Sequence, residues 1–340
     1  MSWLSFLRRA PTRPRPYRGP VRGRGPERQR EQFVSPVAML PAVPPRHTPA
    51  REAAHKGNLR SIVAMLLAVA FFSLMDVLLK LLSQSYPAMQ VAALRGLTAM
   101  PLVLLYVLWR GAAGTLLRVR WPLHLLRGAL SIGMLFLFTY GVRHLPLSNA
   151  YTLFFVAPLL ITALSIPFLG ERVPRLHWLA IAVGLLGVLV ALRPSAEGFF
   201  SWGGLAVLGA ATCYAASAIA GRLLSRTDSS ESMVFWVMTL LTLGAGALAL
   251  PQWVAIDPAH GWWLMGLALT GFAGQVAITE AFRHGQASAV APFEYSALAW
   301  AIALDWLIWT VLPDGYTLAG AAVIVASGLF LLRREKAQAN

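Results

Sequence analysis

Apolar residues dominate the chain after Arg60, in runs of about 20 residues separated by short polar connections. As an α-helix rising 1.5 Å per residue, a run of this length crosses roughly 30 Å of hydrocarbon. The runs lack alternation of apolar and polar residues, which excludes membrane-spanning strands. The pattern predicts an all-α polytopic membrane protein of ten transmembrane helices, over residues 61–82, 88–109, 122–142, 147–169, 176–192, 202–224, 232–252, 261–282, 288–311 and 315–332.

The cations between these runs predict the orientation of the helices. With the amino terminus inside, only Arg143 and Arg193 lie in the outer loops. The inner loops and carboxyl tail hold Arg110, Arg118, Arg120, Arg172, Arg175, Arg222, Arg226, Arg283, Arg333, Arg334 and Lys336. We therefore expect a multi-pass protein of the bacterial inner membrane with both termini in the cytoplasm.

Composition supports a protein whose main partner is the lipid bilayer. Of the 340 residues, 57% are hydrophobic and 13% are charged, whereas soluble domains carry about 25% charged residues. A soluble enzyme is excluded. The single cysteine, Cys213, cannot form an internal disulfide or a cysteine-rich metal site. We expect no cofactor and no bound metal.

Residues 1–60 differ from the rest of the chain. They hold 13 of the 29 Lys and Arg residues against three glutamates, and ten prolines. Such a segment buries too little apolar surface to fold alone, and we expect a disordered, basic, Pro/Arg-rich cytoplasmic tail. The tail either binds anionic lipid or RNA, or is a solvated anchor of the topology, or reflects translation that starts at Met39 or Met65. We favour the readings without a ligand, and expect no nucleic-acid partner.

The spanning region contains an internal repeat with an offset of 140 residues. Arg143-His144 and Arg283-His284 align in this register, as do Ala157 with Ala297 and Leu192-Arg193 with Leu332-Arg333. We predict two five-helix units, 61–193 and 202–333. Because five is odd, the second unit enters the membrane from the opposite face, and such inverted repeats favour alternating access around a site between the halves.

Two segments resemble a known family. Phe168-Leu169-Gly170-Glu171-Arg172 closes the fourth run, and residues 283–295 read RHGQASAVAPFEY. With Asp76, Lys80 and Arg95, these segments are similar to the EamA-type repeats of the drug/metabolite transporter superfamily, in particular the bacterial subgroup of S-adenosylmethionine and riboflavin carriers. The resemblance covers residues 60–334 and implies a secondary carrier of small organic metabolites. Gly170-Glu171 is replaced by Thr310-Val311 in the second copy, so the glutamate acts only once.

Ionisable residues within the runs are the candidates for function, because each costs about 2.5–3.5 kcal/mol to insert. Asp76 and Lys80 are four residues apart and can pair on one helix face. Arg95 lies at a similar depth in the second run. We expect these three charges to meet, either as an ion-pair clamp or as a gate or contact for a substrate carboxylate.

Glu294 and Asp305 lie eleven residues apart in the ninth run, which places them on one face of a continuous helix. Tyr295 and Trp300 flank this stripe, as a pathway for an amine-bearing or aromatic metabolite would require. Glu294 has no neighbouring cation to pair with, so it is our candidate for a proton-coupling site. The alternative is a structural pair with another helix.

Other polar residues give weaker signals. Tyr140, Tyr214 and Gln275 lie in apolar runs and either contact a substrate or satisfy interhelical contacts. We expect Arg127 to extend toward the cytoplasm. Gly209, Cys213, Ser217 and Gly221 form a small-residue stripe for close helix packing, and Pro158 and Pro292 are expected to loosen the fourth and ninth helices.

The sequence therefore predicts a secondary transporter of a small organic metabolite, such as an amino acid, S-adenosylmethionine or riboflavin. We expect the first, second, third, sixth, eighth and ninth helices to line its cavity. A polytopic enzyme is the first alternative, but the histidines lie at the ends of the runs without catalytic or metal-ligand spacing. A channel is the second, but no ring of charges or filter is evident. A monomer and a homodimer both remain open.

Overall fold

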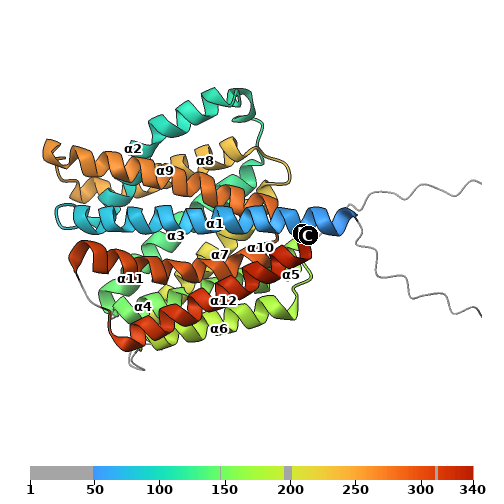
Figure 1. The fold of residues 1–340 in the computed structure, drawn as a ribbon. Helices are drawn as coiled ribbons and strands as arrows, with labels where there is room; N and C mark the ends of the chain where they lie inside the picture. Colours follow the sequence, from blue (N-terminus) through green and yellow to red (C-terminus); the bar gives the residue numbers. More distant parts are fainter. Residues whose placement is uncertain (1–48, 146, 195–200, 311–312, 340) are drawn as a thin grey trace, which may run out of the picture. The chain divides into compact units, whose positions relative to one another are not determined.

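The computed structural model describes residues 49–145, 147–194, 201–310 and 313–339, which belong to one compact unit, His47–Asn340 (Figure 1). Among these residues there is no strand, and ten helical segments are long and apolar enough to span a membrane, which confirms the predicted all-α class. The α-helices are α1 (Pro49–Leu82), α2 (Ala88–Trp109), α3 (Trp121–His144), α4 (Leu147–Phe154), α5 (Ala157–Leu169), α6 (Arg175–Leu192), α7 (Trp202–Leu224), α8 (Ser230–Ala249), α9 (Gly261–His284), α10 (Ala287–Val290), α11 (Ser296–Trp309) and α12 (Gly315–Ala339). Short 3₁₀ segments are η2 (Ala113–Thr115), η3 (Leu250–Gln252), η4 (Pro258–His260) and η5 (Ala291–Tyr295).

Helix α1 begins earlier than the sequence predicted. It starts at Pro49, inside the segment 1–60 that we expected to be a disordered tail. Asn58, on this first part of the helix, is only 4% exposed, and its side-chain oxygen accepts a hydrogen bond from the backbone N–H of Gln286 at 2.9 Å. Tertiary packing thus extends the helix where composition alone predicted disorder. Residues 1–48 lie outside the described part of the chain.

The fourth and ninth spans are both interrupted, at the prolines that the sequence singled out, Pro158 and Pro292. Helix α4 ends at Phe154 and α5 begins at Ala157, with Pro158 in its first turn. In the ninth span, η5 separates α10 from α11 and contains Pro292. Proline lacks a backbone N–H and removes one helical hydrogen bond. Each break leaves irregular backbone at the depth where the cavity described below is found.

The helices pack in pairs, each made of one helix from the first half of the chain and one from the second. Helix α1 packs on α9 and α3 on α7, while α2 packs on α8 and α6 on α12. At the α6–α12 contact, a Cβ on Gly187 or Gly320 would meet the other residue's carbonyl oxygen at 3.0 or 2.5 Å. The C-cap residues of α5 and α11, Gly170 and Thr310, are 140 residues apart and both left-handed, with φ of 70° and 54°. An inverted repeat with the predicted offset would produce these relations.

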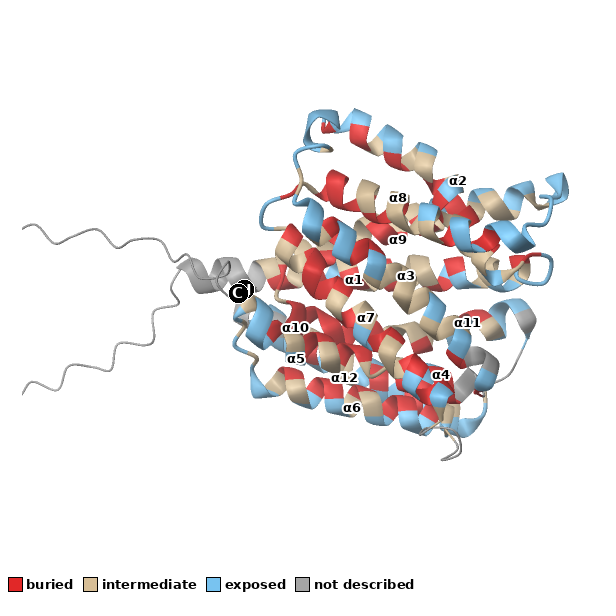
Figure 2. Cartoon of the chain, turned by 180° about the vertical axis from the view of Figure 1, so that it is seen from behind, coloured by how far each residue is buried: buried red, intermediate tan, exposed pale blue. Residues whose placement is uncertain are grey.

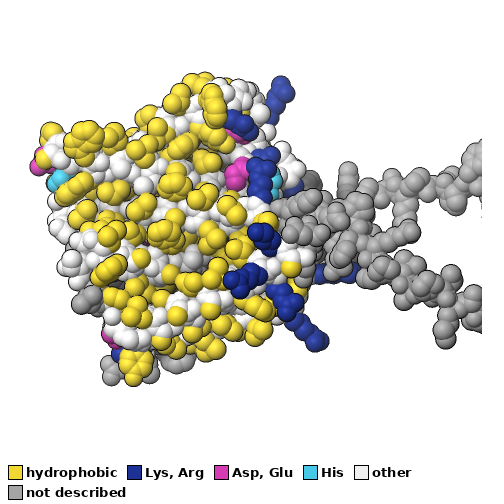
Figure 3. Space-filling model, in the orientation of Figure 1, with side chains coloured by type: hydrophobic (Ala, Val, Ile, Leu, Met, Phe, Trp, Pro, Cys, Tyr) yellow, Lys and Arg dark blue, Asp and Glu magenta, His cyan; other side chains and the backbone are white. Residues whose placement is uncertain are grey.

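Side chains are distributed as the membrane requires. Buried residues concentrate where α5, α7 and α10 meet, whereas the outward surfaces of the outer helices are exposed (Figure 2). Many exposed residues are apolar, including Leu105 and Leu186, and hydrophobic side chains cover the flank of the bundle (Figure 3). Arginine and lysine gather at the end marked C in Figure 1. We call this the basic end; α1 begins there and α2, α7, α9 and α12 finish there. The other end is the opposite end.

Candidate functional site

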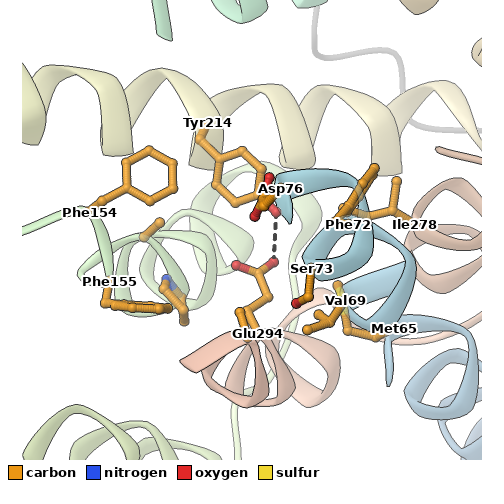
Figure 4. A pocket seen from close by; sticks show the side chains of 13 residues that line it. Met65, Val69, Phe72, Ser73, Asp76, Phe154, Phe155, Tyr214, Ile278 and Glu294 are labelled. Atoms are coloured by element: carbon orange, nitrogen blue, oxygen red, sulfur yellow. Dashed lines mark hydrogen bonds between the residues drawn. The ribbon is translucent and has the colours of Figure 1, made fainter. Parts of the chain in front are cut away.

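A cavity of about 140 Å³ lies between α1, the α4–α5 break, α7, α9 and the η5–α11 segment (Figure 4). Its ionisable lining residues are two carboxylates, Asp76 and Glu294, and a tyrosine, Tyr214. Apolar and small residues complete the lining: Met65, Val69, Phe72, Ser73, Phe154, Phe155, Ala157, Pro158, Ile278 and Ala297. Of the predicted cavity helices, the first, sixth, eighth and ninth line it. The second and third do not, and the fourth span, which we did not predict, does.

Glu294 enters the cavity from η5. Its side chain is 9% exposed, and the Tyr214 hydroxyl donates a hydrogen bond to Oε1 at 3.1 Å. Figure 4 shows the two side chains pointing toward one another from opposite walls. The proline-containing 3₁₀ segment, rather than a continuous α-helix, gives Glu294 this direction. A carboxyl away from bulk water and from cations is costly to ionise, which makes Glu294 responsive to a cationic ligand or a proton.

Asp76 faces the same cavity from α1, one turn after Ser73. The guanidinium of Arg95, on α2, interacts electrostatically with Asp76 and lies over the ring of Phe72 at 5.3 Å. Arg95 Nε is buried and has no hydrogen-bond partner within the described part of the chain. The predicted association of Asp76 with Arg95 is therefore present, although Arg95 reaches the cavity wall from behind Phe72.

Lys80 does not join this group. It donates to Asp305 at 3.2 Å, and this ion pair connects α1 with α11. No ion pair between described residues joins Lys80 to Asp76, so that predicted pair is wrong. The predicted common stripe of Glu294 and Asp305 assumed a continuous α-helix, but Glu294 lies in the 3₁₀ segment η5 and Asp305 in α11. Asp305 is not among the residues lining the cavity.

Four other candidate residues lie away from the cavity. Tyr295 is 1% exposed and packs against Phe155 with ring centroids 5.9 Å apart. Gln275 is buried in α9, while Trp300 is 42% exposed. Tyr140 is also exposed, and its ring lies 4.4 Å from that of His144. These positions fit packing and lipid-facing roles better than substrate contact.

Phe72, Phe154 and Phe155 supply the aromatic walls, and none of them was predicted from the sequence. Only their positions in the sequence could have indicated them: Phe154 and Phe155 directly precede the break at Pro158, and Phe72 lies one turn before Asp76. Aromatic residues are common in apolar spans, so only the cavity singles these three out.

Glu171 has no glutamate counterpart in the second copy of the repeat. It lies at the basic end, where the two halves of the chain meet. Its Oε1 accepts from the backbone N–H of Ala287 at 2.9 Å, and its Oε2 accepts from the backbone N–H and hydroxyl of Ser288 at 3.1 and 2.9 Å. The carboxylate therefore caps the start of α10, where unpaired backbone N–H groups favour an anion. It connects the end of α5 to the ninth span beside the cavity.

The arrangement of ten apolar helices around a polar cavity flanked by broken helices is that of a membrane carrier. The EamA-like transporter family model matches residues 59–193 and 201–333, and the chain belongs to this family. It is a multi-pass membrane transporter of small metabolites, not an enzyme.

Curated relatives are transporters of different metabolites. The chain is 32% identical over 277 residues to the pseudopaline exporter CntI of Pseudomonas aeruginosa, covering 81% of this chain and 96% of that protein. It is 30% identical to the riboflavin transporter of Vibrio cholerae, covering 73% and 84%. It is 29% identical to the S-adenosylmethionine uptake transporter of Rickettsia conorii, covering 84% and 96%. A solved crystal structure shares the fold with a TM-score of 0.70 at 20% identity, covering 81% of this chain and 98% of that one.

Proposed function

We propose that this transporter moves a small organic metabolite that carries a cationic amine, by alternating access of the cavity to the two sides of the inner membrane. The observation that carries the proposal is the pair of carboxylates, Asp76 and Glu294, facing one small cavity from different helices. Arg95 offsets the charge of Asp76, whereas no described cation pairs with Glu294, so an apolar environment with this second carboxylate favours a ligand that brings a positive charge. The surrounding aromatic rings favour a cation with apolar bulk, through cation–π and packing contacts.

Alternating access is supported by the way the cavity is built. Helices α5 and α7 form one side of the cavity, and α1, α9 and η5 form the other. We call these the α5–α7 side and the α1–α9 side. Both halves of the chain contribute to each side, and each contributes one interrupted span. The basic end is the cytoplasmic end in this proposal, since cations accumulate on that face.

Glu294 is the proposed site of proton coupling. Its carboxyl can hold either a proton or the amine of the substrate, and its Tyr214 hydrogen bond is compatible with both states. Exchange of the two at one group would link substrate movement to a proton gradient. The relatives named above include both an exporter and uptake carriers, so both import and export of each solute are to be measured.

The test is transport into proteoliposomes, with and without a pH gradient. The solutes are S-adenosylmethionine, riboflavin, and aromatic and branched amino acids, assayed with wild type, Glu294→Gln and Asp76→Asn. Asp305→Asn is the matched control, because it removes a carboxylate from the same span outside the cavity. We expect saturable transport of an amine-bearing solute, lost or uncoupled from pH in Glu294→Gln and kept in the control. Wild-type transport and pH response in both cavity variants would contradict the proposal.

A further inference from the structure

Arg127 is a buried cation that has no anionic partner among the described residues. It lies on α3 and is 8% exposed, so the prediction that it extends to the cytoplasm is wrong. Its Nε and Nη1 atoms are buried, and neither has a hydrogen-bond partner among the described residues. Burying a guanidinium in this state is costly unless an anion satisfies it in some state of the protein.

The neighbouring acidic group is already occupied. Asp228 accepts from His124, one turn before Arg127, at 2.8 Å. It also accepts from the backbone N–H of Arg120 at 3.1 Å and from the hydroxyl of Thr227 at 2.7 Å. Arg95, the other buried arginine, differs because Asp76 compensates its charge. Among the described residues, Arg127 therefore has neither a free carboxylate beside it nor a hydrogen-bond acceptor for two of its nitrogens.

The position of Arg127 relates it to the cavity. A Cβ built at Gly221 would lie 3.4 Å from the guanidinium carbon, an ordinary van der Waals distance, so the guanidinium packs directly against α7 at this residue. Tyr214 lies seven residues earlier on α7, which is close to two full turns, so both positions share a helix face. Arg127 also interacts electrostatically with Tyr214. The guanidinium thus follows the cavity-lining face of α7 toward the basic end.

A row of polar groups results, from Glu294 through Tyr214 to Arg127. Its first member is acidic and its last is basic. Along α7, the two contact points of the row, Tyr214 and Gly221, are about two turns apart, or roughly 10 Å. A zwitterionic metabolite has matching groups at its two ends. The closed contacts at the basic end keep Arg127 out of water in this conformation, and opening of that end would add it to the cavity.

We propose that Arg127 is an anion-binding subsite, which takes the carboxylate of a zwitterionic amino-acid-like substrate when the basic end opens. The inference rests on the proposed function and sharpens its substrate class from an amine to an amine with an acidic group. A guanidinium suits this role because it can donate two parallel hydrogen bonds to a carboxylate.

The first experiment asks whether position 127 lies on the water-filled route. The single cysteine makes this simple: Cys213→Ala removes it, and Arg127→Cys is then treated with an anionic methanethiosulfonate reagent in lipid nanodiscs. Ser73→Cys, in the cavity, is the reactive reference, and Val188→Cys, fully buried in α6, is the unreactive one. Because a minor open state gives access, we expect position 127 to react at least about tenfold faster than position 188. Reaction as slow as at position 188 overturns the subsite.

The second experiment compares α-amino acids with the amines made by removing their carboxylate, such as tryptophan with tryptamine, as stabilising ligands of purified full-length protein. One charged hydrogen bond corresponds to about tenfold or more in affinity, so the wild type should bind the amino acids at least that much more tightly. Arg127→Gln should bind both equally, and Arg127→Lys should keep part of the preference. Retention of chromatographic behaviour shows that the variants fold.

The outcomes separate this inference from the proposed function. Equal wild-type affinity for amino acids and amines, with binding lost in Glu294→Gln, leaves the amine site and overturns the anion subsite. An unchanged preference for amino acids in Arg127→Gln also overturns it. Binding of neither class by the wild type overturns both proposals.

Discussion

The two ends of the helix bundle hold the cavity walls together in different ways. At the basic end, polar contacts cross between the walls: Glu171, after α5, caps α10, and Arg222 of α7 donates to the carbonyl of Arg283 in α9. At the opposite end, the ion pair of Lys80 with Asp305 connects α1 to α11, which are on the same side. The hydrogen bonds at the basic end therefore join the two walls, whereas separation of the walls at the opposite end does not break the Lys80–Asp305 ion pair.

The contacts also differ in burial. Asp228 and His124, at the basic end, have side chains 2% and 1% exposed, whereas Lys80 and Asp305 are 56% and 47% exposed. Buried hydrogen bonds leave unsatisfied groups when one partner is removed, while exposed ion pairs contribute about 0–1 kcal/mol. The comparison implies that stability and closure depend on different contacts at the basic end, because the most buried one, Asp228 with His124, is not among those that join the walls.

The largest expected change in stability comes from Asp228→Ala. The substitution leaves the buried ring nitrogen of His124, the N–H of Arg120 and the hydroxyl of Thr227 without their acceptor. We expect a loss of about 2–4 kcal/mol in the free energy of unfolding, measured by denaturant titration in mixed micelles. Asp228→Asn, which keeps one acceptor oxygen, should lose less. A loss below that of the exposed Lys80 pair would contradict the burial argument.

Compared with Asp228→Ala, Glu171→Ala should have a smaller effect on stability and a larger effect on closure of the basic end. It removes three hydrogen bonds that cap α10 from the other wall of the cavity. We expect a loss of about 1–3 kcal/mol and increased labelling of a Ser73→Cys reporter from the basic end in sealed liposomes. Glu171→Gln, which retains one acceptor, is the matched control. Its stability and its labelling should lie between those of the wild type and of Glu171→Ala.

Labelling from the basic end that is unchanged in Glu171→Ala would show that this cap does not hold the walls together. An equal increase in Asp228→Ala would show that closure depends on general stability at that end, which removes the distinction between the two contacts.

Lys80→Ala should change little. The pair with Asp305 is about half exposed and its members are on one side of the cavity. We expect less than about 1 kcal/mol of destabilisation and unaltered labelling from either end, by the same two assays. A marked increase in labelling from the opposite end would identify this ion pair as a gate and reverse the comparison.

These differences mark the limit of what the sequence could predict. Run length and hydropathy were enough for the ten spans, and the prolines for both interruptions, because these follow from local rules of helix formation in lipid. Glu294, Tyr214 and Asp76, which the sequence singled out because polar groups within spans are few, all line the cavity. Such selection needs only the identity of a residue and its depth.

Partners between helices could not be predicted in the same way. Lys80 has Asp76 one turn away on its own helix, yet binds Asp305, which is 225 residues away. Glu171 had no assigned partner, and its three donors belong to another span. Asp305 likewise pairs with Lys80 of another span, and a 3₁₀ segment rather than a continuous α-helix holds Glu294. The choice among partners depends on helix rotation and tilt, which tertiary packing sets.

The smallest expected effect concerns pH at the opposite end, where Asp314 pairs with Arg193 between α12 and α6. Hydrogen bonds from Thr317, together with the charge of Arg193, hold the pKa of the Asp314 carboxyl below its usual range. Because the folded-state pKa is the lower one, the stability from this group is present above the pKa of the unfolded chain. It is lost only as the pH falls through the pKa of the folded state.

Carbon-13 NMR of labelled aspartate, with Asp314→Asn to assign the resonance, should therefore show that Asp314 titrates at a lower pH than a free aspartate, whose pKa is about 3.9. Arg193→Gln should raise that pKa only in part, since the Thr317 bonds remain; a full return to the free value would make the exposed ion pair, rather than the local cap, the stronger influence at this end.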